Sequence, residues 1–204
     1  MRSYLERSMS FAEYSALIER LVEEGKTTGP KQSDSLANFT RLNWQRMKRL
    51  AKTTEVEETV AAAVRTNDRR MKWLIITEAW CGDAAQNIPI IEKIAAESGI
   101  IETRYILRDE YSDLIDRFLT FGARSIPKLI ALDSETLDVL GEWGARPAVA
   151  QELFFELRDK GAEKPAVMEA LQRWYNQDQG RSLQNEFAEL ISSWGGRKTV
   201  PARA

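Results

Sequence analysis

The sequence predicts an α/β fold in which a central mixed sheet of about four strands is flanked by helices, with further helices before and after it. Four short segments have the apolar or alternating pattern of strands, and they lie at residues 73–77, 103–107, 128–132 and 137–143. A helical stripe of isoleucines separates the first two segments. Because a strand, helix, strand order gives a right-handed parallel crossover, these two strands should run parallel in one sheet.

Residues 1–70 are predicted to form a helical N-terminal extension. Three helices are expected, and the middle one should begin at about Ser35. The first and third begin with the residue pairs of a capping box, which are Ser10 with Glu13 and Thr54 with Glu57.

Residues 71–160 contain the predicted sheet. The run at 73–77 is nearly continuous in apolar, β-branched residues, which is typical of a central strand covered on both faces. Segment 137–143 alternates and follows a turn, so it should be the edge strand of a hairpin. Helical stripes at 88–95 and 114–119 should cover the sheet.

Residues 161–195 are predicted to form C-terminal helices, and residues 196–204 a mobile tail. The whole chain, residues 1–204, is expected to form one compact unit.

Composition excludes several functional classes. The chain has 29 basic and 31 acidic residues, which gives no general attraction to nucleic acid or to anionic lipid. No segment has the length and apolar character of a membrane span, so a cytoplasmic location is expected. Because the chain contains no histidine, we expect neither a Ser-His-Asp hydrolase nor a metal site.

The single cysteine, Cys81, directly follows the buried strand and precedes a predicted helix. At a helix N-terminus, backbone N–H groups and the helix dipole favour the thiolate, so Cys81 is a candidate nucleophile. Asp83 has two interpretations: it caps the helix, or its negative charge acts on the thiol and opposes thiolate formation. Cys81 itself has the alternative of a packed, inert side chain.

Two separated motifs carry a resemblance to a known family. The segment Trp80-Cys81-Gly82-Asp83-Ala84 resembles the Trp-Cys-Gly-Pro-Cys turn of thioredoxins, and the segment ending in Ile126-Pro127 is similar to the one that holds their cis-proline. The two motifs occur in the family's order. The longer segment 78–87, together with Thr28-Gly29-Pro30, resembles a bacterial branch of thioredoxin-like proteins.

The resemblance implies a thioredoxin-like fold with Cys81 as nucleophile and Trp80 beside it. It also implies two departures, because Ala84 occupies the position of the second, resolving cysteine and Ile75 that of the buried acid. A dithiol cycle is therefore not expected. A single thiolate is still able to exchange with a disulfide, and no bound cofactor is expected, although glutathione is a candidate co-substrate.

Three functional hypotheses remain open. The first is monothiol exchange through a mixed disulfide with glutathione or a protein thiol. The second is a non-catalytic module in which the backbone of Ile126, exposed beside a cis Pro127, pairs with a protein or peptide partner. A trans proline in an ordinary turn is the alternative at this position. The third is a homodimer in which the added helices cover the site.

Overall fold

The predicted fold class is confirmed by a computed structural model, which describes residues 1–195. The predicted mobile tail, residues 196–204, lies outside the described residues. A mixed four-stranded sheet has the order β2-β1-β3-β4, with β1 parallel to β2 and antiparallel to β3. The strands are β1 (Met71–Thr77), β2 (Ile101–Leu107), β3 (Lys128–Asp133) and β4 (Val139–Gly144).

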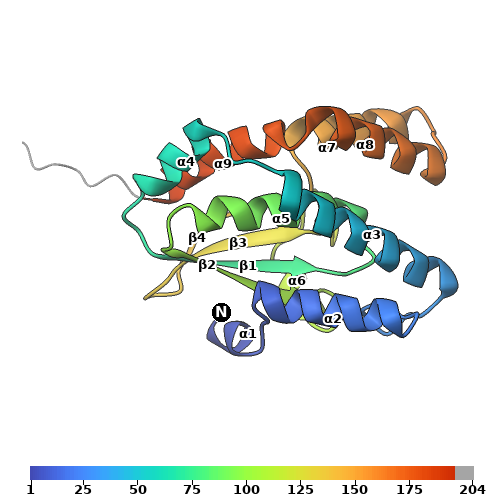
Figure 1. The fold of residues 1–204 in the computed structure, drawn as a ribbon, viewed down its shortest axis with the longest axis horizontal. Coiled ribbons are helices and arrows are strands. Elements are labelled where there is room, and N and C mark those ends of the chain that lie inside the picture. The colour runs from blue at the N-terminus through green and yellow to red at the C-terminus, as the bar shows by residue number, and fades with distance from the viewer. Residues whose placement is uncertain (196–204) are drawn as a thin grey trace, which may run out of the picture.

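Helices surround this sheet (Figure 1). Their bounds are α1 (Arg2–Glu6), α2 (Phe11–Glu23), α3 (Asp34–Thr53), α4 (Glu58–Arg65), α5 (Gly82–Ala96), α6 (Ser112–Ile115), α7 (Ala148–Asp159), α8 (Lys164–Asp178) and α9 (Arg181–Trp194). In Figure 1, α5 and α9 lie on one side of the strands and α2 on the other. None of the helices in residues 1–195 combines the length and the apolar character that a membrane span requires.

One of the two predicted capping boxes is confirmed and the other is wrong. The Ser10 side chain accepts the Glu13 N–H while the Glu13 carboxylate accepts the Ser10 N–H, so α2 begins as expected. Thr54 instead ends α3, and Glu57 precedes α4 without a side-chain cap. The Glu57 N–H donates to Oε1 of Gln184 at 2.8 Å, so a side chain from α9 replaces the local cap.

The helix expected over 114–119 is shorter than predicted, because α6 ends at Ile115. Thr120 and Ala123 exchange two backbone hydrogen bonds of 2.9 and 3.0 Å, which close a tight turn. Phe121 and Gly122 lie inside that turn with positive φ angles of 51° and 75°. A helix cannot continue through this conformation.

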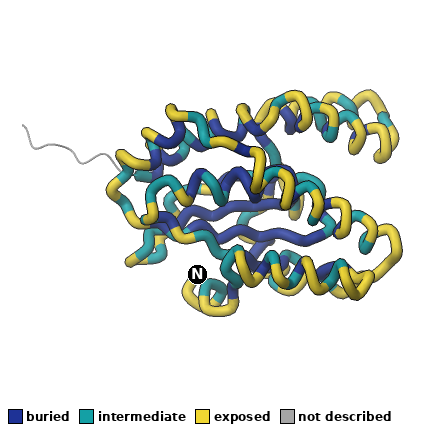
Figure 2. Tube along the Cα trace, in the orientation of Figure 1, coloured by how far each residue is buried: buried dark blue, intermediate teal, exposed yellow. Residues whose placement is uncertain are grey.

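Buried apolar residues form two separate clusters. The main cluster contains the strands, α5, α9 and side chains of α2 and α3, and in Figure 2 it follows the dark tube of the sheet. Phe187 of α9 packs edge-on against Trp73 of β1 and Trp143 of β4. A second, small cluster joins α7 to α8.

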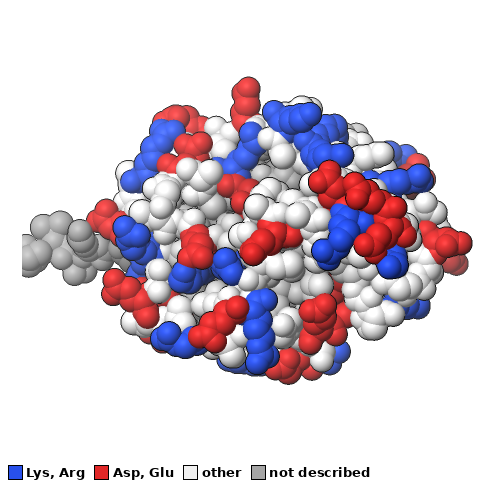
Figure 3. Space-filling view, turned by 60° about the horizontal axis from the view of Figure 1, so that its bottom comes forward, with Lys and Arg blue, Asp and Glu red and all other residues white. Residues whose placement is uncertain are grey.

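Basic and acidic side chains are interspersed on the face shown in Figure 3. This arrangement agrees with the formal net charge of −2.

Candidate functional site

Cys81 lies at the carboxyl end of the central strand and is the N-cap residue of α5. Its Sγ accepts the Ala84 N–H at 3.5 Å, and its thiol donates to the carbonyl oxygen of Ile126 at 3.2 Å. Only 7% of the residue is exposed. The predicted site residues Cys81 and Ile126 are therefore in direct contact, through a hydrogen bond that the thiol makes as donor.

The protonation of Cys81 follows from its burial. Burial, and after it the charge of Asp83, raise the pKa of the thiol to about 12, although the Ala84 N–H and Arg146 oppose the rise. The helix terminus thus acts in the expected direction, but desolvation has the larger effect. At neutral pH this conformation holds a thiol and not a thiolate.

Asp83 does not cap α5, so that interpretation is wrong. Its carboxylate forms an ion pair with Arg146 at 2.7 Å and accepts the Tyr175 hydroxyl at 2.9 Å. The Tyr175 hydroxyl also accepts an N–H of the Asn87 amide at 3.1 Å. Burial raises the pKa of Asp83, and the charge of Arg146 opposes this rise. Arg146 and Tyr175 thus link α5 to the segment after β4 and to α8.

Pro127 directly follows Ile126, the residue whose carbonyl accepts the Cys81 thiol. The Ile126–Pro127 peptide bond is cis. The strand-end residue Gly144 is adjacent, because a Cβ placed there would be 2.2 Å from the Pro127 carbonyl oxygen. Only glycine fits this close approach. Trp80 is half-buried beside the site, with the Arg108 guanidinium 4.8 Å from its ring centroid.

The comparisons with known proteins agree with this geometry. A family model described as thioredoxin matches residues 29–165, which include β1, Cys81, Pro127 and Gly144. The chain belongs to this thioredoxin family. The match does not decide the bacterial branch that the Trp-Cys-Gly-Asp-Ala segment resembles, so that assignment stays a prediction.

Two solved structures share this thioredoxin-family fold at 17% identity. One is a protein of unknown function from Pseudomonas aeruginosa, with a TM-score of 0.56 over 90% of this chain and 97% of that one. The other is an HIV epitope-scaffold, with a TM-score of 0.55 over 91% of this chain and 97% of that one. No curated protein shows significant similarity to the chain.

The thioredoxin-family site also contains a buried acid that sequence reasoning missed. Ile75, at the position implied for that acid, is fully buried and apolar. Glu78, directly after β1, is buried as well, and its Oε1 accepts the Asp109 N–H at 2.8 Å. Burial raises the pKa of Glu78. An acidic residue directly after a buried strand is the signal that would have identified it.

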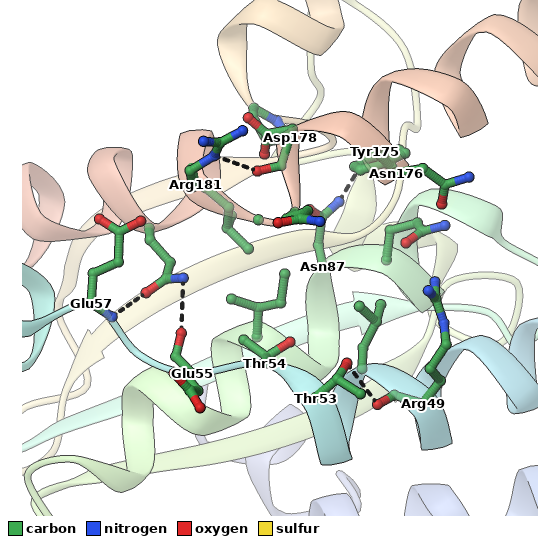
Figure 4. A pocket seen from close by; sticks show the side chains of 18 residues that line it. Arg49, Thr53, Thr54, Glu55, Glu57, Asn87, Tyr175, Asn176, Asp178 and Arg181 are labelled. Carbon is green, nitrogen blue, oxygen red and sulfur yellow. Dashed lines mark hydrogen bonds between the residues drawn. The ribbon is translucent and has the colours of Figure 1, made fainter.

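A cavity of about 420 Å³ lies where α3, α5, α8 and α9 meet, and Asn87 and Tyr175 are among its lining residues (Figure 4). Many of its polar groups already have internal partners. Gln184 accepts the Glu57 N–H and donates to the Glu55 carbonyl, and Arg181 donates to carbonyl oxygens at the end of α8. This cavity is a junction between the added helices. Among residues 1–195, no three His, Cys, Asp or Glu side chains gather as a metal site requires.

Proposed function

We propose that this thioredoxin-family protein binds an extended peptide segment beside Ile126 and Pro127, and that Cys81 serves as a structural thiol of the binding loop. The observation that carries the proposal is the hydrogen bond from the Cys81 thiol to the Ile126 carbonyl at 3.2 Å, with Cys81 only 7% exposed. Burial raises the pKa of this thiol to about 12, which opposes nucleophilic attack.

Two features of the segment 120–127 support peptide binding. Within residues 1–195 the Ile126 N–H takes part in no hydrogen bond, and the carbonyl of an extended peptide would satisfy it. Phe121 is 76% exposed and contacts Phe155 edge-on at 5.1 Å between ring centroids. Exposed aromatic side chains are typical of a recognition surface.

The test is to select binders from a random peptide library displayed on phage and to measure their affinities by fluorescence anisotropy. Cys81→Ser should retain the wild-type affinity, because the serine hydroxyl is still a hydrogen-bond donor for the Ile126 carbonyl and no reaction of the thiol is required. Phe121→Ser should weaken binding about tenfold, as the loss of an aromatic anchor does. Val139→Ser removes another exposed apolar side chain, 46% exposed on β4, and serves as the matched control.

Two outcomes would contradict the proposal. One is that the library yields no peptide whose binding is sensitive to Phe121→Ser. The other is that Cys81→Ser abolishes peptide binding while the protein remains folded by circular dichroism.

Monothiol exchange is the second candidate, and the Ala84 N–H directed at Sγ favours it. In that reaction the Cys81 thiolate attacks one sulfur of oxidised glutathione or of a protein disulfide. A mixed disulfide forms, the old S–S bond breaks and the other sulfur leaves as a thiolate. A thiol of the partner must then resolve the adduct.

Alkylation separates the two candidates. Iodoacetamide rates across about pH 5 to 10 should show no transition below the free-cysteine value of about 8.5 if Cys81 is structural. Intact mass after exposure to oxidised glutathione should then show no adduct. A transition well below that value, together with a glutathione adduct, would favour exchange. Light scattering tests the proposed homodimer separately.

A further inference from the structure

A second cavity, of about 400 Å³, lies between the first turn of α5 and the helices α7 and α8. Gly82 and Asp83 form one side of it, while Cys81, Ile126 and Pro127 are not among its lining residues. Its volume is within the range of about 300–1,000 Å³ that small-molecule sites occupy. It is therefore a separate space beside the proposed peptide site.

The side chains that line this cavity include more cations than carboxylates. Arg46, Arg146 and Lys164 line it. Arg146 is paired with Asp83, yet its buried Nε has no acceptor among the described residues. Within residues 1–195, neither Arg46 nor Lys164 has a carboxylate within 4.0 Å.

The Arg46 guanidinium lies at the start of α5. Its Nη1 donates to the Asn43 side chain at 3.1 Å and lies 4.0 Å from the place where a Cβ on Gly82 would be. Burial lowers the pKa of Arg46, and the nearby Arg49 lowers it further, so no local anion offsets the burial. The other lining carboxylate, Glu169, is exposed and faces Arg173 on its own helix.

The remaining walls are mostly apolar. Phe39 comes from α3, Phe154 from α7, and Met168 from α8, where it is 41% exposed. The Arg146 guanidinium lies 4.4 Å from the Phe154 ring centroid, so the charged and apolar parts of the lining are adjacent. A ligand that matches both parts needs an apolar body and one negative group.

We propose that this cavity binds a small organic carboxylate, with its charged group at Arg46 and Lys164 and its aliphatic or aromatic body between Phe39, Phe154 and Met168. Guanidinium and ammonium groups form charge-assisted hydrogen bonds with carboxylates, roughly twice as strong as neutral ones. Nothing in the lining of this cavity requires the Cys81 thiol.

The test uses the full-length protein labelled with [¹³C-methyl]methionine and titrated with octanoate. The chain has five methionines, and among the described residues Met168 is the one that lines this cavity. The Met168 methyl resonance, assigned with Met168→Leu, should shift saturably while the others stay unchanged. Octanol, which has the body without the charge, and acetate, which has the charge without the body, should each bind at least about tenfold more weakly.

Charge variants locate the carboxylate. Arg46→Gln and Lys164→Gln should each weaken octanoate binding about tenfold. Lys48→Gln removes an exposed cation of α3 that lies over Trp44 and outside the cavity, so its affinity should equal that of the wild type.

The proposal is overturned if octanoate produces no saturable shift at Met168 or if octanol binds as tightly as octanoate. It is also overturned if both glutamine variants at the cavity retain wild-type affinity. Because octanoate binding is read at Met168 and peptide binding by anisotropy, failure of one proposal is distinguishable from failure of the other.

Discussion

The helices added before and after the sheet are attached in different ways. Tyr14 and Ile18 of α2 and Met47 of α3 are buried in the same cluster as the strands. The α7–α8 hairpin, residues 148–178, has its own small cluster of Ala150, Val167 and Leu171, with half-buried neighbours around it. Figure 2 shows the same contrast, because little of the hairpin is dark.

The contacts between the hairpin and α5 are largely polar. Tyr175 bonds to Asp83 and Asn87, and Gln172 accepts a hydrogen bond from Gln86 at 3.0 Å. Segments with few buried apolar contacts open locally at lower free energy than the core. We therefore expect α2 and α3 to unfold with the sheet, and the hairpin to open separately.

The largest expected effect comes from Tyr14→Ala. Tyr14 is 1% exposed, stacks on Tyr105 with centroids 5.2 Å apart, and contacts Thr77 through its hydroxyl. Its removal should lower the free energy of unfolding by about 3–5 kcal/mol, as for other buried aromatic residues. Urea titration measures the loss. A loss below about 1 kcal/mol would place α2 outside the cooperative unit.

A smaller effect is expected from Leu171→Ala in the hairpin. The local cost should be about 2 kcal/mol, at the low end for core leucines, because the second cluster is small. Hydrogen exchange should show faster exchange of α7 and α8 amides, with the slowest amides of β1 unchanged. If amide exchange in β1 accelerated equally, the hairpin and the sheet would unfold together. The hairpin would then be no less firmly attached than α2 and α3.

The smallest expected effect is a loss of stability at alkaline pH, and it is tested with Cys81→Ser. Burial raises the pKa of Cys81 from an ordinary 9.0 to about 12, so the folded protein retains a proton that the unfolded chain loses. This contribution is fully present below about pH 9 and is lost as the pH rises towards about 12. Cys81 belongs to the main cluster, so the loss should appear in global unfolding.

Between about pH 8 and pH 10 the wild type should lose about 1.4 kcal/mol more stability than Cys81→Ser, whose hydroxyl does not titrate. Urea titrations at both pH values measure the difference, and other alkaline groups cancel in the comparison. Parallel losses in the two proteins would show that Cys81 titrates alike in the folded and unfolded states.

The sequence predicted what depends on local pattern. The run at 73–77 identified β1, and the position of Cys81 after it was sufficient to place the thiol at the end of the sheet. Features that depend on distant partners were missed. Asp83 resembled a cap because Tyr175, 92 residues later, does not appear in the local pattern.

The same limit explains why the raised pKa of Cys81 and the absence of the second capping box were not predicted. The helix terminus at Cys81 is local, but its contact with Ile126 is 45 residues away, and the burial associated with it controls the pKa. Glu57 matched a capping pattern until Gln184, 127 residues later, took its N–H. Local preferences are weak, and tertiary contacts override them.

The packing of α9 has a consequence for synthesis on the ribosome. Phe187 and Trp194 of α9 contact Trp73, and Phe187 also contacts Trp143, so the sheet acquires this cover only from the last described helix. In a nascent chain that has emerged only as far as α8, Trp73 and Trp143 do not yet have Phe187 to pack against. We expect ribosome-bound chains of that length to remain sensitive to protease, and the main core to form after translation of α9.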